Sequence, residues 1–474
     1  MSAVGAARGG ILEERPLRYP DASSAEVMEN RGWWLVGMNF LLPGSAQVLA
    51  GNRRLGRLGI GATLALWVAA AVLLVSALLW RTALITLFTN TWFLLLVEMI
   101  LGAYIVLWII LTVDTLRLVR FVRVRGWARA GIPILAVSLL VASSAVTVTA
   151  ARYVDSARGA IGSIFGASGP SQPPSDGYYN ILLLGGDDGK GRDSMRFDSI
   201  SVVSINAETG QVARTGIPRD LAGWPFAADS PMRKLYPDLH TGHGDANCGW
   251  GSGINQLNNE LTVCHHGDEL YPDAKSQGST PAIEATRDAV EGITGLKIQY
   301  YVLMNYGGFA QLVDALGGVD ITVTQKLPKG GGPHYPGEPA SKWAKGWIMP
   351  GKQHMNGNTA QWYARSRETT SDFDRVKRQA QLQEAILKQV TPANLMTRFQ
   401  QVAAAGKNLL QTDIPPSMLG YFTDLGTKSK KLKSPSVVLS PQAGIDQFHP
   451  DIAYIHELVD KMLHPATKTP EPKR

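Results

Sequence analysis

The chain has 474 residues, of which 45% are hydrophobic, with two cysteines and a formal net charge of +7 at pH 7. This length predicts one to three domains. The cysteine count excludes a disulfide-rich scaffold but allows one bridge. The positive charge favours acidic partners, such as phosphates or an anionic membrane surface.

Most long apolar runs fall before residue 151. Three segments are long and apolar enough to span a bilayer, at about 58–80, 92–113 and 131–150. The stretch 33–50 is apolar but contains Asn, Pro, Gly, Ser and Gln. We interpret it as re-entrant or interfacial, with a full span as the alternative. The polar first thirty residues predict no secretory signal peptide.

Arginines decide the expected orientation. They cluster before the first span and between the second and third spans, whereas the loop 81–91 holds one. The positive-inside rule places both Arg-rich loops in the cytoplasm. The prediction is a multi-pass membrane protein whose second half is extracellular, and this holds even if 33–50 spans. The predicted parts are a cytoplasmic tail (1–32), a transmembrane region (33–150), a Gly/Ser/Pro-rich linker (151–178) and an external domain (179–474).

The external domain alternates apolar strand-like runs with amphipathic helical patterns. Strands are predicted at 179–186, 199–206, 211–217, 297–305 and 317–324, the second and third forming a hairpin. Helices are predicted at 281–294, 306–316, from Asp372 onward, and at 451–463. The fold class expected is α/β, with a mixed central sheet flanked by helices, preceded by an all-α transmembrane anchor.

Basic residues crowd one helix and its approach. They are Arg365, Arg367, Arg375, Lys377 and Arg378. A solvated charged face is one interpretation, with Asp372 and Asp374 supplying surface ion pairs. A socket for an anion with several charges is the other.

The pattern of this helix supports the socket. Ser371 is the expected N-cap, with Asp374 at the capping-box position. Arg375, Gln379 and Leu382 then fall on one stripe with Ile386, and the apolar end of that stripe should face the core. Arg375 and Gln379 therefore occupy positions where leucine would be expected, and a buried arginine needs a partner.

Carboxylates follow the first predicted strand of the external domain. In GGDDGKGRDSMRFDSI (185–200), Asp187 comes just after one strand and Asp198 opens the next. The Walker and dinucleotide-binding spacings are absent. Two carboxylates at neighbouring strand ends could hold one Mg²⁺ bridged to phosphates. Alternatively, these aspartates only form the turn.

Seven stretches, taken in order, resemble the LytR-CpsA-Psr family of bacterial cell-wall proteins across roughly residues 179–386. They are NILLLGGDD, RFDSISVVSIN, GIPRD, RKLY, YYVLMNYGGFAQLVDALGGVDITV, GNTAQWYARSR and DFDRVKRQAQ. The resemblance implies an enzyme, a phosphotransferase that moves a glycopolymer with its phosphate from a polyprenyl-pyrophosphate carrier to peptidoglycan. The implied partners are that lipid-linked glycan, peptidoglycan and membrane lipid, and not nucleic acid. The alternatives are a polyprenyl-pyrophosphate hydrolase and a non-catalytic sensor of polyprenyl phosphates.

The resemblance also implies roles for individual residues. The metal carboxylates would be Asp187 and Asp198, holding Mg²⁺ or Mn²⁺. The pyrophosphate-binding residues would be Arg196, Arg219, Lys234, Arg365, Arg367, Arg375, Arg378 and Gln379, with Arg233 a rival for Lys234. Catalysis would fall to Asp187, Asp198, Arg219 and Arg375, and the general base is left open among Asp187, Asp198 and Asp220. The sequence departs from the family at Gly186, at Phe197 and in the stretch after Lys234.

Three further expectations remain. The helices near 306–316 and 382–390 are either walls of a lipid pocket or simple core. Cys248 and Cys264 would form a disulfide in an oxidising external setting, and a zinc site with nearby histidines is the rival interpretation. High Ala, Gly and Arg usage is typical of a GC-rich genome, such as that of an actinobacterium.

Overall fold

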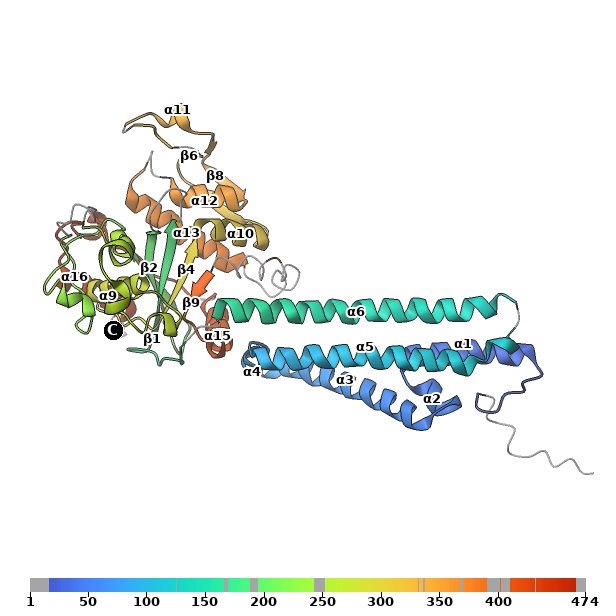
Figure 1. The fold of residues 1–474 in the computed structure, drawn as a ribbon. Helices are drawn as coiled ribbons and strands as arrows, with labels where there is room; N and C mark the ends of the chain where they lie inside the picture. The colour runs from blue at the N-terminus through green and yellow to red at the C-terminus, as the bar shows by residue number, and fades with distance from the viewer. Residues whose placement is uncertain are drawn as a thin grey trace, which may run out of the picture. The chain divides into compact units, whose positions relative to one another are not determined.

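A computed structural model describes the arrangement of the chain. It describes residues 17–124, 126–165, 169–187, 195–242, 252–330, 332–335, 337–366, 370–389, 401, 410–430 and 432–465. The chain divides into two compact units, Met1–Asp155 and Ser156–Arg474 (Figure 1).

The first unit is all helical. Its helices are α1 (Ala25–Leu41), α2 (Ser45–Ala50), α3 (Arg53–Leu79), α4 (Arg81–Phe88), α5 (Thr91–Val119), η1 (Phe121–Arg123) and α6 (Ala128–Phe165). Three helical stretches are long and apolar enough to cross a membrane, at Arg53–Leu79, Thr91–Arg123 and Ala128–Phe165. They overlap the three predicted spans and differ from them in their bounds. Helix α6 continues to Phe165, beyond the predicted end at residue 150, because no proline interrupts 151–165.

The stretch 33–50 is not one continuous helix. Helices α1 and α2 are separated at Leu42–Gly44, where Gly44 has a φ of 99° that favours glycine. Gln47 is fully buried, and its amide donates to the Leu111 carbonyl at 2.8 Å and to Thr115 Oγ1 at 2.9 Å. The polar residues of this stretch therefore pack against α5.

The second unit is built on a six-stranded sheet of order β10-β3-β2-β1-β4-β9. Its strands are β1 (Tyr178–Asp187), β2 (Arg196–Asn206), β3 (Val212–Ile217), β4 (Tyr300–Asn305), β9 (Leu410–Thr412) and β10 (Ser436–Val438). Strand β1 pairs with β2 antiparallel and with β4 parallel, so the sheet is mixed, as predicted.

The predicted strand at 317–324 lies outside this sheet. It is β5 (Val319–Val323), which pairs only with β8 (Gly351–Met355) in a two-stranded sheet. A second small sheet joins β6 (Leu327–Lys329) and β7 (Gly346–Ile348). The short helices of the unit are η2 (Pro231–Lys234), η3 (Ile254–Gln256), α7 (Leu257–Asn259), η4 (Glu260–Cys264), α8 (Gly267–Leu270), η5 (Lys275–Gln277), α11 (Ala340–Trp343), η6 (Pro416–Met418) and η7 (Pro441–Ala443).

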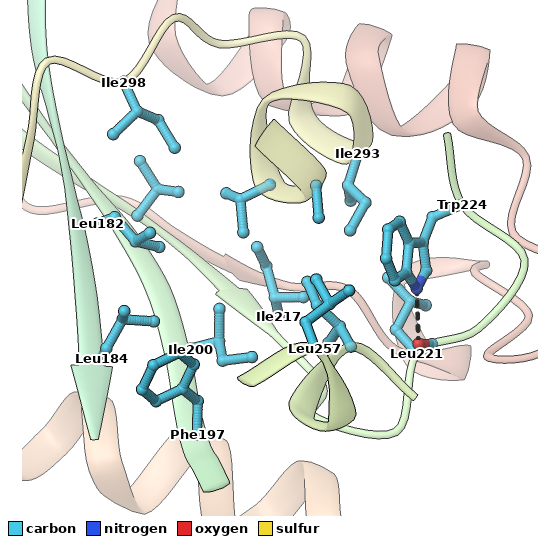
Figure 2. Packing of buried hydrophobic residues seen from close by; sticks show 14 of the residues in the cluster. Leu182, Leu184, Phe197, Ile200, Ile217, Leu221, Trp224, Leu257, Ile293 and Ile298 are labelled. Atoms are coloured by element: carbon cyan, nitrogen blue, oxygen red, sulfur yellow. Dashed lines mark hydrogen bonds between the residues drawn. The ribbon is translucent and has the colours of Figure 1, made fainter. Parts of the chain in front are cut away.

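Longer helices cover both faces of the central sheet, which confirms the predicted fold class. On one face, α9 (Pro281–Thr294) and α16 (Ile452–Leu463) bury a core that includes Leu182, Ile200 and Ile293 (Figure 2). The other face carries α10 (Tyr306–Leu316), α13 (Asp372–Gln389) and α15 (Leu419–Ser429), and α12 (Gly357–Arg365) packs against α10 and α13. Alternation along β1 separates the two faces, since Leu182 and Leu184 join the first core and Ile181 joins another.

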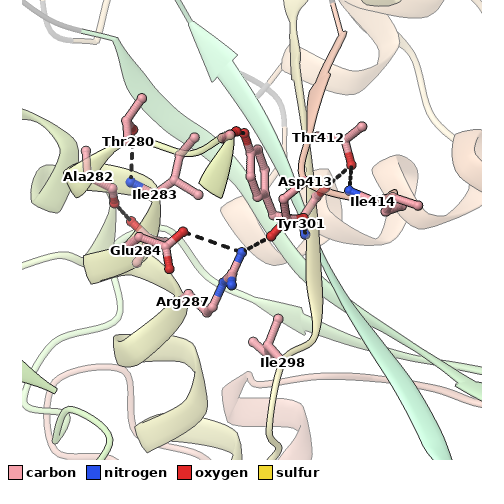
Figure 3. Close-up of polar contacts among 12 residues, drawn as sticks. Thr280, Ala282, Ile283, Glu284, Arg287, Ile298, Tyr301, Thr412, Asp413 and Ile414 are labelled. Atoms are coloured by element: carbon pink, nitrogen blue, oxygen red, sulfur yellow. Dashed lines mark hydrogen bonds and ion pairs between the residues drawn. The ribbon is translucent and has the colours of Figure 1, made fainter. Parts of the chain in front are cut away.

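A buried charge network fixes α9 to the sheet (Figure 3). Arg287 on α9 pairs with Asp413, which follows β9, and lies 3.5 Å from Glu284. Asp413 also accepts a 2.7 Å hydrogen bond from the Tyr301 amide of β4. Because the charges are paired and hydrogen-bonded, their burial is tolerated, and the network ties three elements together.

Candidate functional site

The end of β1 and the start of β2 meet at one edge of the central sheet. The register pairs Asp187 with Arg196 and Gly186 with Phe197, and it shifts between Gly185 and Gly186. Such a bulge bends a strand and re-aims its side chains. The backbones of the two predicted metal-binding positions therefore lie at neighbouring strand ends, as expected from the sequence. The side chain of Asp187 lies outside what the structure describes.

Asp198 is paired with an arginine from the next strand connection. Arg219, just after β3, donates from Nη1 to Asp198 Oδ1 at 2.6 Å, and its Nε lies 3.4 Å from Asp220. Asp198 is only 8% exposed, whereas the Asp220 side chain is 44% exposed. The backbone of Arg219 is itself anchored, because its carbonyl accepts a hydrogen bond from Asn255. Two predicted site residues from separate stretches of sequence are thus in direct contact.

Helix α13 begins as the sequence predicted. The Ser371 hydroxyl accepts from the Asp374 amide at 3.1 Å, and the Ser371 amide donates to Asp374 Oδ2 at 3.1 Å, which is a reciprocal capping arrangement. The side-chain hydrogen bond from Ser371 is the main reason that the pKa of Asp374 falls below its ordinary value.

The predicted stripe on α13 is buried. Arg375 is 2% exposed, Gln379 is 8% exposed and Leu382 is 1% exposed. The interpretation of Arg375 and Arg378 as members of a solvated charged face is therefore wrong, because both guanidinium groups lie inside the unit. A guanidinium charge buried to this degree is costly without partners. The burial of Arg375 and Arg378 therefore requires specific partner groups around each of them.

Gln379 connects α13 to two other elements. Its Oε1 accepts a 2.8 Å hydrogen bond from Ser199 of β2, and its Nε2 donates to the Ala364 carbonyl of α12 at 3.3 Å. Ser199 follows Asp198 directly, so β2 contacts Arg219 through one residue and α13 through the next. The sheet edge and the helix with the buried arginine therefore belong to one site. Ser199 was not predicted, because a serine inside a strand carries no distinctive signal.

Arg378 has a different environment from that of a free anion-binding group. It donates from Nε to the Tyr363 carbonyl at 3.0 Å, from Nη1 to Thr370 Oγ1 at 3.1 Å, and to the Ser366 carbonyl. These acceptors lie at the end of α12 and in the segment that leads to α13. Arg378 thus ties the end of α12 to Thr370, just before α13, and its predicted contact with pyrophosphate stays a prediction.

The remaining predicted residues are spread over several elements. Arg365 ends α12, half-buried, with its guanidinium 5.5 Å from the centre of the Trp362 ring. Arg196 opens β2 and is half-buried, whereas Lys234 is exposed at the end of η2. Arg367 and Cys248 lie outside the described residues, so the Cys248–Cys264 bridge stays a prediction.

An apolar cavity of about 320 Å³ opens beside this site. Its walls come from β1, β4, α10 and α13, with a few polar groups from β2 and α13. The lining residues include Leu183, Val302, Phe309, Leu312, Leu382 and Ile386, together with Ser199 and Gln379. The two helices predicted as either pocket walls or core therefore do line a cavity. Its polar wall residues are Gln383 and the pair Ser199 and Gln379, which connects β2 to α13.

Two histidines of the rival zinc interpretation, His240 and His265, lie beside a buried glutamate. His240 Nε2 lies 2.9 Å from Glu260 Oε2, and His265 Nε2 lies 3.3 Å from Glu260 Oε1. Tyr236 donates to Glu260 at 2.5 Å. Burial raises the pKa of the Glu260 carboxyl, but the hydrogen bonds with His240 and Tyr236 outweigh burial and lower this pKa below its ordinary value. His243, like Cys248, lies outside the described residues.

Among the described residues, one group has three metal-type ligand atoms within 4.8 Å of one another. It consists of Asp176, Asp460 and His464, all of them exposed. None of these residues was predicted from the sequence as a ligand, and exposure of all three makes the group a weak candidate for a metal centre.

Comparison with known proteins gives the site its context. Residues 272–462 match the model of the LytR_cpsA_psr family. The chain is 26% identical over 261 residues to "Biofilm regulatory protein A" of Streptococcus mutans, covering 51% of this chain and 53% of that protein. It is 27% identical over 237 residues to "Polyisoprenyl-teichoic acid--peptidoglycan teichoic acid transferase TagU" of Bacillus cereus, covering 50% of this chain and 60% of that protein.

The alignments thus span 53% and 60% of the length of these two curated relatives. Among solved structures, the crystal structure of B. subtilis TagV aligns with a TM-score of 0.41 at 20% identity, over 61% of this chain and 98% of that one. The second unit thus carries a match to the LytR_cpsA_psr family over residues 272–462, in agreement with the resemblance predicted from the sequence.

Proposed function

We propose that the protein transfers a glycopolymer, together with its phosphate, from a polyprenyl-pyrophosphate carrier to peptidoglycan. The observation that carries this proposal is the apolar cavity whose wall includes Gln379, one helical turn after the buried Arg375. A ligand that suits this pair of features has an apolar chain and an anionic head group. The relative named TagU is, by its name, a transferase from polyisoprenyl-teichoic acid to peptidoglycan.

The cavity supplies the binding energy for the lipid. Leu183, Phe309, Leu312 and Leu382 present hydrocarbon surface to it. Each CH₂ group moved from water into such surroundings contributes about 0.8 kcal/mol. Burial of hydrocarbon therefore favours binding of a polyprenyl chain in the cavity. The part of the chain that lies outside the cavity can stay in the membrane.

The polar groups beside the cavity suit the head group. A pyrophosphate diester carries two negative charges, and arginine forks match phosphate oxygens two at a time. Arg375 and Arg219 come from different elements that are joined through the adjacent residues Asp198 and Ser199. We assign Arg219 and Arg375 to the phosphate that accumulates charge during transfer, and Arg196, Arg365 and Arg367 with Lys234 to the outer part of the head group.

The reaction needs positioning more than a protein nucleophile. A hydroxyl oxygen of peptidoglycan forms a bond to the phosphorus that carries the glycan, and the bond from that phosphorus to the bridging oxygen breaks. Polyprenyl phosphate leaves with the bonding electrons. The hydroxyl proton passes to a base, for which Asp187, Asp198 and Asp220 are the candidate carboxylates.

The carboxylates at the sheet edge fit a hard divalent cation. Carboxylate oxygens are the ligands that Mg²⁺ prefers, Asp198 is largely buried, and β1 brings the backbone of Asp187 to the start of β2. Asp187 and Asp198 would hold Mg²⁺, with Mn²⁺ as a substitute. Such an ion, when bound, polarises phosphoryl oxygens and offsets their charge.

The three long apolar helices anchor the protein in a membrane, and we place the second unit outside the cell, where peptidoglycan lies. The excess of arginine in the loops around the first and third helices supports this orientation. A domain tethered there meets both a membrane-embedded carrier and the wall.

Incubation of the full-length protein in detergent with a lipid-pyrophosphate glycan, peptidoglycan and Mg²⁺, followed by mass spectrometry of muropeptides, tests the proposal. A phosphodiester between glycan and muramic acid is the expected product. Free phosphorylated glycan without this product would make the protein a hydrolase. Retained binding of polyprenyl phosphate with neither product would make it a sensor, and either result overturns the transferase.

A further inference from the structure

A second cavity, of about 240 Å³, lies on the other flank of α13, between that helix and strands β2, β3 and β10. Unlike the apolar cavity, it is lined by hydroxyl, amide and charged groups. Its polar wall includes Ser201, Arg214, Lys377, Gln383, Glu384 and Ser436. The two cavities have Ser199, Gln379 and Gln383 in common, so they adjoin each other at the Ser199–Gln379 hydrogen bond.

Arg214 is the distinctive group in this wall. It lies on β3 and is half-buried, and its Nη1 donates to the Ala380 carbonyl of α13 at 3.5 Å, the long limit for such a bond. Among the described residues it forms no ion pair within 4 Å. Burial lowers the pKa of the Arg214 guanidinium, and Glu384 opposes this lowering. An arginine has five N–H donors. The hydrogen bond from Arg214 to the Ala380 carbonyl therefore leaves most of these donors available to a ligand.

Ser201 supplies a second observation. It is 8% exposed, and its hydroxyl oxygen has no hydrogen-bond partner among the described residues. A buried hydroxyl without a partner costs free energy, so this serine is poorly explained by the folded unit alone. It lines the same cavity as Arg214, two residues along β2 from Ser199.

We propose that this polar cavity binds one acidic acetamido-sugar unit, with Arg214 receiving its carboxylate or phosphate and the glutamine and serine side chains its amide and hydroxyl groups. The cavity is smaller than the clefts of roughly 300–1,000 Å³ that hold drug-sized ligands, so it suits a single unit. Lys377, Glu384 and Ser436 are exposed at its wall, so the rest of a polymer can continue into solvent. The proposal rests on the proposed transfer reaction and adds a sugar subsite to it.

Two sources could supply such a sugar. The acceptor peptidoglycan contains muramic acid, whose lactyl group ends in a free carboxylate wherever no peptide is attached to it, and the donor glycopolymer begins with a sugar attached to phosphate. Both are acetamido or phosphorylated sugars with one negative group, and both must approach the same phosphorus. The adjoining cavities place either one next to the lipid pocket.

The test is binding of soluble sugars to the full-length protein in detergent, measured by saturation-transfer NMR and titration calorimetry. The probes are N-acetylmuramic acid, N-acetylglucosamine 1-phosphate and neutral N-acetylglucosamine. At least one acidic sugar should bind about tenfold more tightly than the neutral one, since charge-assisted hydrogen bonds are the stronger kind. The acidic sugar that binds identifies the source.

Variants assign the binding to this cavity. Arg214→Gln should remove the preference for the acidic sugar, whereas Lys352→Gln, an exposed change on β8, should leave it intact. Ser201→Ala is the second variant, because removal of a buried, unpartnered hydroxyl leaves the melting temperature equal or higher while sugar binding weakens several-fold. A melting scan of each variant separates lost binding from lost folding.

Equal binding of all three sugars, or a preference unchanged by both Arg214→Gln and Ser201→Ala, would overturn the sugar subsite. The assay contains no lipid carrier and no transfer occurs in it, so its failure leaves the transferase to be judged by muropeptide analysis. Conversely, sugar binding by a protein that forms no phosphodiester would retain the subsite and reject the transferase.

Discussion

Arg219 and Asp198 face each other across two strand ends, with 2.6 Å between Nη1 and Oδ1. A charge-assisted contact of this length fixes the orientation of both side chains. It also joins Asp198, a predicted metal ligand, to Arg219, a predicted phosphate-binding residue. Since Ser199 follows Asp198 and contacts Gln379, this pair links the sheet edge to the cavity beneath α13.

The first prediction concerns Asp198. Asp198→Asn keeps the shape of the side chain but removes the charge that would hold Mg²⁺ and Arg219, so transfer should fall by about 10²-fold or more. Mg²⁺ should raise the melting temperature of the unchanged protein and have little effect on the variant. Muropeptide mass spectrometry and melting scans with and without Mg²⁺ measure these effects. Asp320→Asn, an exposed change on β5, is the control, and an Asp198→Asn protein with normal transfer and a normal response to Mg²⁺ would contradict the assignment.

The second prediction compares a buried, positioning arginine, Arg378, with a half-buried one, Arg365. Arg378→Gln should lower the free energy of unfolding by about 3 kcal/mol, because it leaves buried carbonyl groups of Tyr363 and Ser366 without their charged donor. Arg365→Gln, on the half-buried end of α12, should cost less than about 1 kcal/mol. Urea titrations of the two variants provide the comparison, and equal losses of stability would show that Arg378 does not hold the approach to α13.

The third prediction tests the apolar cavity as the lipid pocket. Leu312→Trp places a larger side chain in the wall, so affinity for a donor with a long polyprenyl chain should fall by about tenfold or more. A donor with a single short isoprenoid unit, which needs little of the cavity, should bind nearly as before. Gln311→Trp adds the same side chain to the exposed face of the same helix and serves as the control. If the Leu312→Trp variant bound neither donor while its melting temperature stayed unchanged, this wall would instead contribute to head-group binding.

The fourth prediction is the pH dependence of stability from Glu260. Its pKa is lower in the folded protein than in the unfolded chain, so the unfolded chain binds more protons as the pH falls. The stabilisation from Glu260 is present above its ordinary pKa of 4.5 and is lost as the pH drops below that value. Urea titrations at pH 7 and pH 4 should therefore show a smaller loss of stability for Glu260→Gln than for the unchanged protein. Glu457→Gln, on the exposed face of α16, should behave like the unchanged protein, and an identical pH profile for all three would refute the network.

Local patterns predicted individual elements well. Helix α9 has the bounds expected at 281–294, the Ser371 capping arrangement is present, and Arg375, Gln379 and Leu382 share one buried stripe. Each of these features depends on residues within a few positions of one another, where helical spacing and capping preferences decide the structure. The mixed sheet followed similarly from apolar runs that alternate with helices.

Features that depend on distant contacts were not accessible in this way. The strand at 319–323 has the same pattern as a central strand, yet it pairs only with β8. Arg378 and Arg375 look alike in sequence, but the acceptors that surround Arg378 become visible only when α12 is placed beside α13. Ser199 gains its role from a partner 180 residues away.

The amino-acid sequence by itself determined the apolar anchor helices, the alternation of strands and helices, and the order of the arginine- and aspartate-bearing stretches. Tertiary structure alone decided which of those charges meet, which serve as internal supports, and that an apolar and a polar cavity adjoin across Gln379. The physical reason is that periodicity and helix capping act over a few residues, whereas ion pairing and cavity shape depend on which surfaces the packed sheet brings together.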